Sequence, residues 1–105
     1  MSKLQLSKEV EINGELTKEI EYDFEDLKGD VMEVAIKELQ KSGYVPSVQE
    51  TDVLLHAHIF AQASQLDYSD IKRLGIRDYM KATSLVRNFF FEGLADSQEE
   101  NLLEQ

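Results

Sequence analysis

Residues 4–24 read LQLSKEVEINGELTKEIEYDF, and this stretch decides the fold. Its apolar residues follow a two-residue period in two runs, from Leu4 to Ile12 and from Leu16 to Phe24, with Asn13-Gly14 between them. This period on both sides of a turn dipeptide is typical of a β-hairpin. The alternate positions of the second run are polar, so we expect the sheet to cover a core on one face only.

The register of this hairpin depends on the length of its loop. A two-residue turn at Asn13-Gly14 would place Glu11 opposite Leu16 and divide the apolar residues between the two faces. A three-residue loop would place Val10 opposite Leu16 and keep the apolar residues together. We therefore expect the three-residue loop, with Gly14 at positive φ.

Beyond the hairpin the period of the sequence becomes helical. Capping residues and glycines predict helices at 30–41, at about 52–64, at 68–74 for one or two turns, and at 76–94. A hairpin followed by these segments predicts an α+β fold, in which an N-terminal antiparallel β-hairpin packs on about three α-helices. Residues 1–94 form one domain in this interpretation, and 95–105 form an acidic, flexible, disordered C-terminal tail.

Length and charge restrict the function. The chain has 105 residues, with 21 acidic and 11 basic residues for a net charge of -10 and no cysteine. Such a charge repels phosphate backbones and anionic lipids, so we expect neither nucleic acid nor a membrane as a partner. The longest apolar runs are too short to span a bilayer and the first residues do not resemble a signal peptide, which makes the cytoplasm the default compartment.

The sequence contains no recognisable catalytic or metal-binding motif. His56 and His58 are two residues apart, which separates them by about 200° on a helix, too far to share a metal ion. We expect one of them at a helix interface and the other near solvent. Nucleophile-elbow and phosphate-loop motifs are absent, and the carboxylates lie on polar faces. We therefore expect no enzyme activity, no metal and no cofactor.

The last predicted helix carries more apolar surface than one core needs. Its expected core face is formed by Ile76, Tyr79, Thr83, Val86, Phe90 and Leu94. Phe89 and Phe91 then lie on opposite flanks, about 200° apart. The helix at 52–64 is also apolar all round, because Leu55 and Ile59 lie opposite its other apolar residues.

Two interpretations of this surplus remain open. In the first, the short segments at 24–28 and 68–74 fold over it. In the second, an exposed patch binds another protein or a second copy of the chain. The candidate protein-binding residues are Leu55, Ile59, Leu85, Phe89 and Phe91.

Two further stretches stand out by their charge. The basic residues Lys72, Arg73, Arg77, Lys81 and Arg87 read as a solvated helix face, since no aromatic residues are interleaved in the manner of a nucleic-acid site. From Glu92 onward the chain has five acids and no base. An acidic end of this kind keeps a protein soluble or contacts a basic partner.

Both ends of the sequence resemble a known family, the tail assembly chaperones of long-tailed bacteriophages. The opening LQLSKEVEINGELTKEIEYDFEDLKGD is similar to the paired alternating segments and the short L-x-G-x-D/E element of that family. The closing RDYMKATSLVRNFF is similar to its final helix, in which an acid followed by an aromatic begins a helix that ends in a phenylalanine pair. The resemblance covers most of residues 3–91.

The resemblance implies a non-catalytic protein of the host bacterial cytoplasm that is absent from the mature virion. Members bind the phage tape measure protein and recruit tail tube protein around it, and surplus apolar surface further predicts a homo-oligomer. An alternative from another class is an acidic mimic of nucleic acid that inhibits a DNA-binding protein. Mimic binding would weaken steeply with salt, whereas apolar chaperone contacts would change little. The split of the acids between the hairpin and the tail favours the chaperone.

Overall fold

The structure is a computed structural model that describes residues 2–45 and 52–103. It confirms the α+β fold and the order of its elements. The hairpin strands are β1 (Ser2–Ile12) and β2 (Glu15–Tyr22), and the helices are α1 (Gly29–Lys41), α2 (Val53–Ser64), α3 (Tyr68–Lys72) and α4 (Ile76–Leu103). The short α3 is the predicted element of one or two turns.

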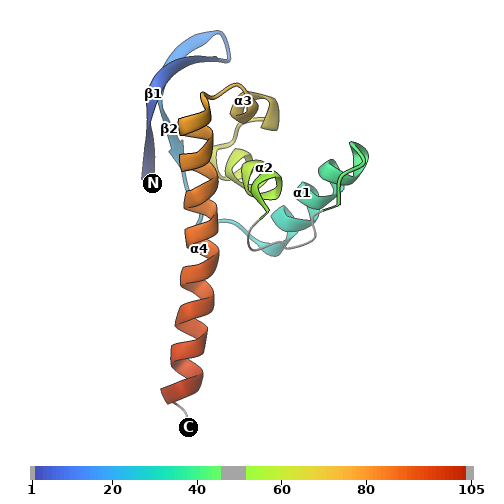
Figure 1. Ribbon diagram of the computed structural model, residues 1–105, viewed down its shortest axis with the longest axis vertical. Coiled ribbons are helices and arrows are strands. Elements are labelled where there is room, and N and C mark those ends of the chain that lie inside the picture. The colour runs from blue at the N-terminus through green and yellow to red at the C-terminus, as the bar shows by residue number, and fades with distance from the viewer. Residues whose placement is uncertain (1, 46–51, 104–105) are drawn as a thin grey trace.

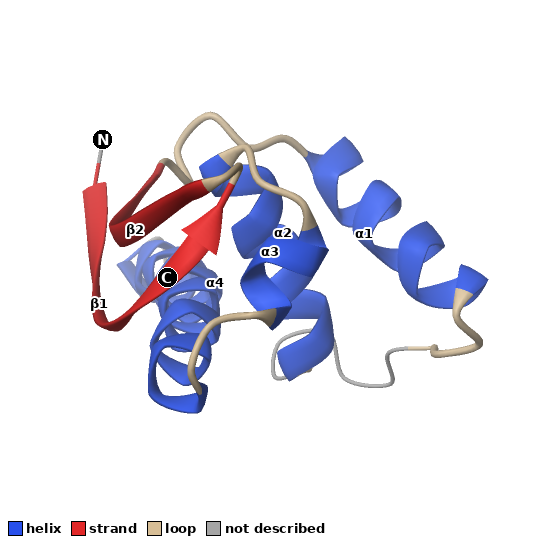
Figure 2. Cartoon of the chain, turned by 90° about the horizontal axis from the view of Figure 1, so that it is seen from above, coloured by secondary structure: helices blue, strands red, loops and turns tan. Residues whose placement is uncertain are grey.

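Helix α2 lies at the centre of the molecule, between α1 on one side and α4 on the other (Figures 1 and 2). It contacts α1, α3, α4 and β2. Because neighbours surround it, a helix that is apolar on every face is stable here. The core also includes residues of both strands and of α1, α3 and α4. The buried residues of α2 itself are Leu55, His56, Ala57, Ile59, Phe60, Ala61 and Ala63.

The ends of α2 follow from local chemistry. The side chain of Asp52 accepts a hydrogen bond of 2.9 Å from the Leu55 amide, which satisfies one of the free amides of the first turn. At the other end Gln65 adopts a left-handed conformation with φ of 58°. Asp67 and Asp70 then form a reciprocal capping box that starts α3 only a few residues later.

The hairpin turn is shorter than predicted. Ile12 pairs with Glu15, so the loop is the two-residue turn Asn13-Gly14, and both residues have positive φ, 54° and 82°. Turns with two positive φ angles match the right-handed twist of a hairpin, which explains the preference for Asn-Gly. Glu11 therefore pairs with Leu16, and the expected three-residue loop is wrong.

A change of register inside the hairpin makes this turn compatible with a core. Leu4 pairs with Ile20 near the open end, and the register shifts between Gln5 and Val10. The strand pairing near the turn therefore has a different register from the pairing at the open end of the hairpin. Leu4 and Ile20 are buried, whereas Leu16 near the tip is 74% exposed.

Helix α4 is longer than the sequence indicated. It continues past the predicted end at Leu94 to Leu103, and its C-terminal half projects away from the body of the molecule (Figure 1). Residues 94–103 contain neither glycine nor proline, so no residue type there stops the helix. That residues 95–105 form a flexible tail stays a prediction.

Candidate functional site

The inner face of α4 packs on the body. Ala82, Thr83 and Val86 are buried, as Thr83 and Val86 were predicted to be, and Tyr79 and Phe90 are half-buried. Ile76 is 74% exposed, which corrects its place in the expected core face. As the first residue of the helix it lines a hollow with Ser7 and Lys8 at the molecular edge. The side chain of Leu94 lies outside the described part of the chain.

The three consecutive phenylalanines have three different environments. The Phe89 ring lies 5.2 Å from the ring of Phe24, in the segment between β2 and α1. The Phe90 ring meets His56 of α2 edge to face at 5.4 Å. Phe91 is 44% exposed. The segment at 24–28 therefore covers Phe89, as the first interpretation of the surplus surface proposed, while Phe91 stays on the surface.

The predicted binding residues separate into buried and accessible ones. Leu55 and Ile59 are 0% and 3% exposed inside the chain, so placing them in a binding surface is wrong. The reason is the central position of α2, which the helical pattern alone does not reveal. Leu85 and Phe89 are half-buried, and Phe91 is exposed. The accessible candidates therefore all belong to α4.

A buried aspartate fixes α4 against the hairpin. Asp78 in the first turn of α4 is 0% exposed. Its carboxylate accepts hydrogen bonds from the Ser7 amide at 2.9 and 3.0 Å, from the Ser7 hydroxyl at 3.1 and 3.2 Å, and from the Lys8 amide at 3.3 Å. The register shift of β1 frees these amides from the sheet ladder, since Ser7 and Lys8 lie between Gln5 and Val10.

The hydrogen bonds keep this carboxylate ionised. Burial alone would raise the pKa of Asp78, but the hydrogen bonds from Ser7 and Lys8 and the charge of Lys81 together lower it below its ordinary value of 3.8. In the sequence Asp78 stands out only as the acid that precedes an aromatic residue at the start of the last helix, and no binding or packing role was predicted for it. A signal for its burial was nevertheless present. Asp78 lies one turn before Ala82 and two turns before Leu85, so it shares one side of the helix with these apolar residues.

The outer face of α4 is defined by Arg77, Met80, Lys81, Ser84, Arg87, Asn88 and Phe91. At about 100° per residue these positions fall within an arc of roughly 120°, opposite Val86. Met80 and Phe91 are 46% and 44% exposed, and the three basic residues are exposed too. Asp78 is the only acid between residues 76 and 91, and it is buried. The outer face is therefore apolar and positively charged, on a protein whose net charge is -10.

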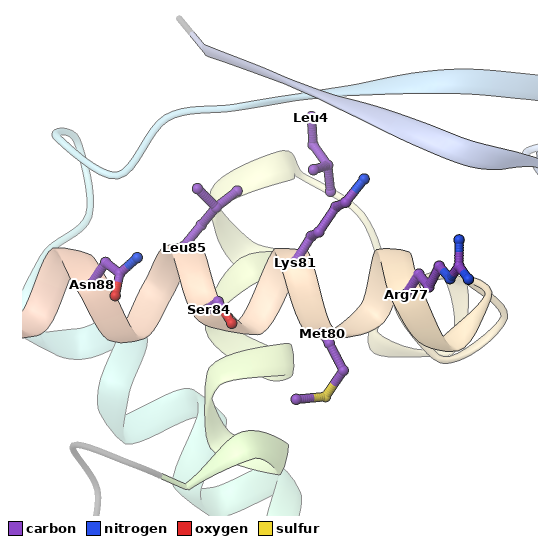
Figure 3. Close-up of a pocket in the computed structure, with 7 residues that line it drawn as sticks. All are labelled: Leu4, Arg77, Met80, Lys81, Ser84, Leu85 and Asn88. Carbon is purple, nitrogen blue, oxygen red and sulfur yellow. The ribbon is translucent and has the colours of Figure 1, made fainter.

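A shallow groove of about 420 Å³ runs along this face beside β1 (Figure 3). Leu4 of β1 faces the helix from across the groove, with Leu85 and Lys81 of α4 pointing toward the strand. Its remaining lining residues are Arg77, Met80, Ser84 and Asn88. An apolar floor with a basic rim suits an amphipathic segment whose apolar stripe is bordered by acids.

The two histidines belong to the packing of α2. His56 is 1% exposed at the interface with α4, and His58 is half-buried and stacks on Tyr68 with ring centroids 4.0 Å apart. Burial lowers the pKa of His58, and the negative charge of Glu38 opposes this only partly. Among residues 2–45 and 52–103, no three His, Cys, Asp or Glu side chains gather as metal ligands would.

A second hollow, of about 640 Å³, lies at the hairpin tip around Arg73. The guanidinium donates to the Glu11 carbonyl at 2.9 Å and to the Asp70 carboxylate at 2.6 Å. These contacts attach α3 to the hairpin, and they occupy the one cationic group of the hollow. The outer face of α4 is therefore the better candidate for a binding site.

In the part of the chain that the structure describes, no helix is both long enough and apolar enough to cross a membrane. No protein-family model matches the sequence, and neither a curated protein nor a solved structure matches it.

Proposed function

We propose that the protein is a phage tail assembly chaperone, a non-catalytic protein that binds the tape measure protein in the host cytoplasm and helps to recruit tail tube subunits. The observation that carries this proposal is the outer face of α4, which exposes Met80 and Phe91 beside a groove with an apolar floor. A chaperone of a long helical client needs such an apolar surface, and the resemblance at both ends of the sequence supports the same conclusion.

The charge pattern also supports a binding protein over a nucleic-acid mimic. A mimic presents acids on the surface that contacts its target, whereas the exposed charges of the outer face are Arg77, Lys81 and Arg87. The client segment that suits this face is an amphipathic helix with acids along its apolar stripe. The remaining negative charge keeps the chaperone and its complexes dispersed.

The test is co-expression with a phage tape measure protein, which is the client that this proposal names. The wild-type chain should keep that client soluble and co-purify with it. The double variant Met80→Ser with Phe91→Ser should lose both effects, because it removes the exposed apolar residues of the outer face.

Leu16→Ser is the matched control, since Leu16 is also exposed and apolar but lies near the hairpin tip. It should behave as the wild type. Equal client binding by the double variant and the wild type would refute the proposed site. No effect of the wild-type chain on the client would refute the proposed function.

A further inference from the structure

The groove beside β1 is lined by a regular set of positions on α4. These positions are Arg77, Met80, Lys81, Ser84, Leu85 and Asn88. They form two overlapping groups of four with the spacing i, i+3, i+4 and i+7, the first from Arg77 to Ser84 and the second from Lys81 to Asn88. Four residues with this spacing surround a hole on a helix surface, into which one side chain of a facing helix inserts. The groove therefore contains two such holes, one helical turn apart.

The two holes are open and largely apolar. Ser84 belongs to both of them, and its small side chain leaves space at their common edge. The first hole is bordered by Met80 and by the aliphatic stems of Arg77 and Lys81. The second is bordered by Leu85, which points toward β1 (Figure 3). Aliphatic side chains of a partner suit both holes.

The charges at the groove favour an acidic partner. Arg77 and Lys81 are exposed, and neither forms a salt bridge with a side chain that the structure describes. None of the lining residues is acidic. Asp78, the only acid between residues 76 and 91, is buried and accepts hydrogen bonds from Ser7 and Lys8. A carboxylate of a partner would therefore meet two cations here without a competing exposed acid.

We propose that the groove binds one amphipathic helix of the client, which inserts two large aliphatic side chains, one turn apart, into the two holes. An acid of the same helix lies beside Arg77 and Lys81. This inference rests on the proposed function and deepens it, because it specifies the segment that the client contributes. The two holes are displaced by four residues, and packing along such rows sets two helices at about 50° to each other. A short client helix is therefore sufficient.

A synthetic peptide tests the groove without any client protein. The probe is a helical peptide of about 18 residues based on alanine and glutamine, with two leucines at i and i+4 and a glutamate one turn beyond each leucine. Backbone amide NMR spectra of the full chain locate its binding. The wild type should bind the probe with a dissociation constant of about 1 mM or lower, with shift changes centred on residues 77–88 and on β1.

Three control peptides change one feature each. The first has its leucines two residues apart, on opposite sides of the helix. The second has lysines in place of the glutamates, and the third has a proline between the leucines, which breaks the helix. Each should bind at residues 77–88 about fivefold more weakly or worse.

Variants of the chain test the same contact from the other side. Ser84→Leu fills the edge that both holes share and should weaken probe binding about tenfold or more. Its matched control is Ser69→Leu, at an exposed serine of α3, which should bind as the wild type does. Arg77→Glu with Lys81→Glu should reverse the preference between the glutamate and lysine peptides. Lys72→Glu with Arg87→Glu makes the same charge change outside the groove and should not reverse it.

Thermal melting shows whether each variant is folded, and the peptide controls on the wild type need no variant. Equal binding of the probe and the first control peptide would overturn the two-hole contact, as would a folded Ser84→Leu variant that binds like the wild type. Equal binding of the proline peptide would overturn the helix and assign an extended segment.

The test also separates this inference from the proposed function. A wild type that leaves the probe unbound but keeps a tape measure protein soluble would overturn the inference alone. A wild type that binds the probe as described but has no effect on the tape measure protein would overturn the proposed function and support the specificity of the groove.

Discussion

Replacement of Asp78 by asparagine should cost more stability than its place in a first helical turn would suggest. The carboxylate accepts hydrogen bonds from two amides and one hydroxyl, and hydrogen bonds to a charged group contribute roughly 1.5–3 kcal/mol each. An asparagine oxygen can keep one donor, but its NH₂ group then faces the others. Ser7 and Lys8 lie at the surface, so water replaces part of the loss. We expect the free energy of unfolding to decrease by about 2–4 kcal/mol. The whole free energy of unfolding of a typical domain is roughly 5–15 kcal/mol.

The matched control is Asp30→Asn. Asp30 also lies in a first turn, that of α1, but it is exposed. Both changes remove a negative charge from a helix N-terminus, which contributes typically about 0.3–1 kcal/mol. Urea unfolding of both variants then isolates the hydrogen-bonded site as the difference between them. If Asp78→Asn costs no more than Asp30→Asn, the anchor between β1 and α4 is not a stabilising feature.

The same site predicts a dependence on pH. Because the pKa of Asp78 is lowered in the folded state, the unfolded chain binds more protons just below the ordinary value of 3.8. The stability from this carboxylate is therefore present above pH 3.8 and is lost as the pH falls through the lowered pKa. The difference in unfolding free energy between wild type and Asp78→Asn should shrink on acidification. A difference that stays constant across this range would contradict the lowered pKa.

Three further predictions test the core, a buried phenol and the hairpin turn. Leu55→Ala should lower the unfolding free energy by about 3–5 kcal/mol, because Leu55 is fully buried; a loss under about 1 kcal/mol would mean that α2 is not central. Burial raises the pKa of Tyr79 to about 12, so its contribution to stability is complete below pH 10 and is lost as the pH rises through 12. Titration of tyrosinate absorbance should show a transition near pH 12 that Tyr79→Phe abolishes, and its persistence in the variant would assign it elsewhere. Gly14→Ala should destabilise the protein by about 1–2 kcal/mol, because φ at this position is +82°. Gly93→Ala inside α4 should stabilise it by roughly 0.5–1 kcal/mol. If thermal melting shows that both changes shift the melting temperature in the same direction, this turn geometry is excluded.

The sequence predicted those parts of the fold that short segments determine. The hairpin, the start of α2 at Asp52 and the break at Gly75 follow from turn dipeptides, caps and periods, and the structure has all of them. The register of the hairpin does not follow from such signals. It depends on the shift around Ser7, whose amide bonds to Asp78 far along the chain. Without that contact, alignment of apolar residues was the only available criterion, and it favoured the wrong loop.

Only part of the candidate site was predicted, and the reason is similar. Hydrophobic periodicity identifies a helix that is apolar on every face, but such a helix is either central or bound by a partner. The choice for Leu55 and Ile59 depends on where α1 and α3 pack, which no pattern within α2 specifies. In α4 the pattern was more informative, because a long helix at the edge of a domain keeps an uncovered side.

The run Phe89 to Phe91 shows how folding and binding can share one helix. A turn of about 100° per residue sends three neighbours in three directions, and only two of these meet the body of this protein. Phe89 and Phe90 are held by Phe24 and His56, whereas Phe91 lies on the outer face beside basic residues. A single exposed phenylalanine is common on a protein surface. Here it lies where α4 leaves the body and one helical turn after the exposed Arg87, so a partner that contacts Phe91 also meets the basic side chains of the outer face. The outer face can therefore be altered at Phe91 or at its charges while the inner face, and with it the fold, stays intact.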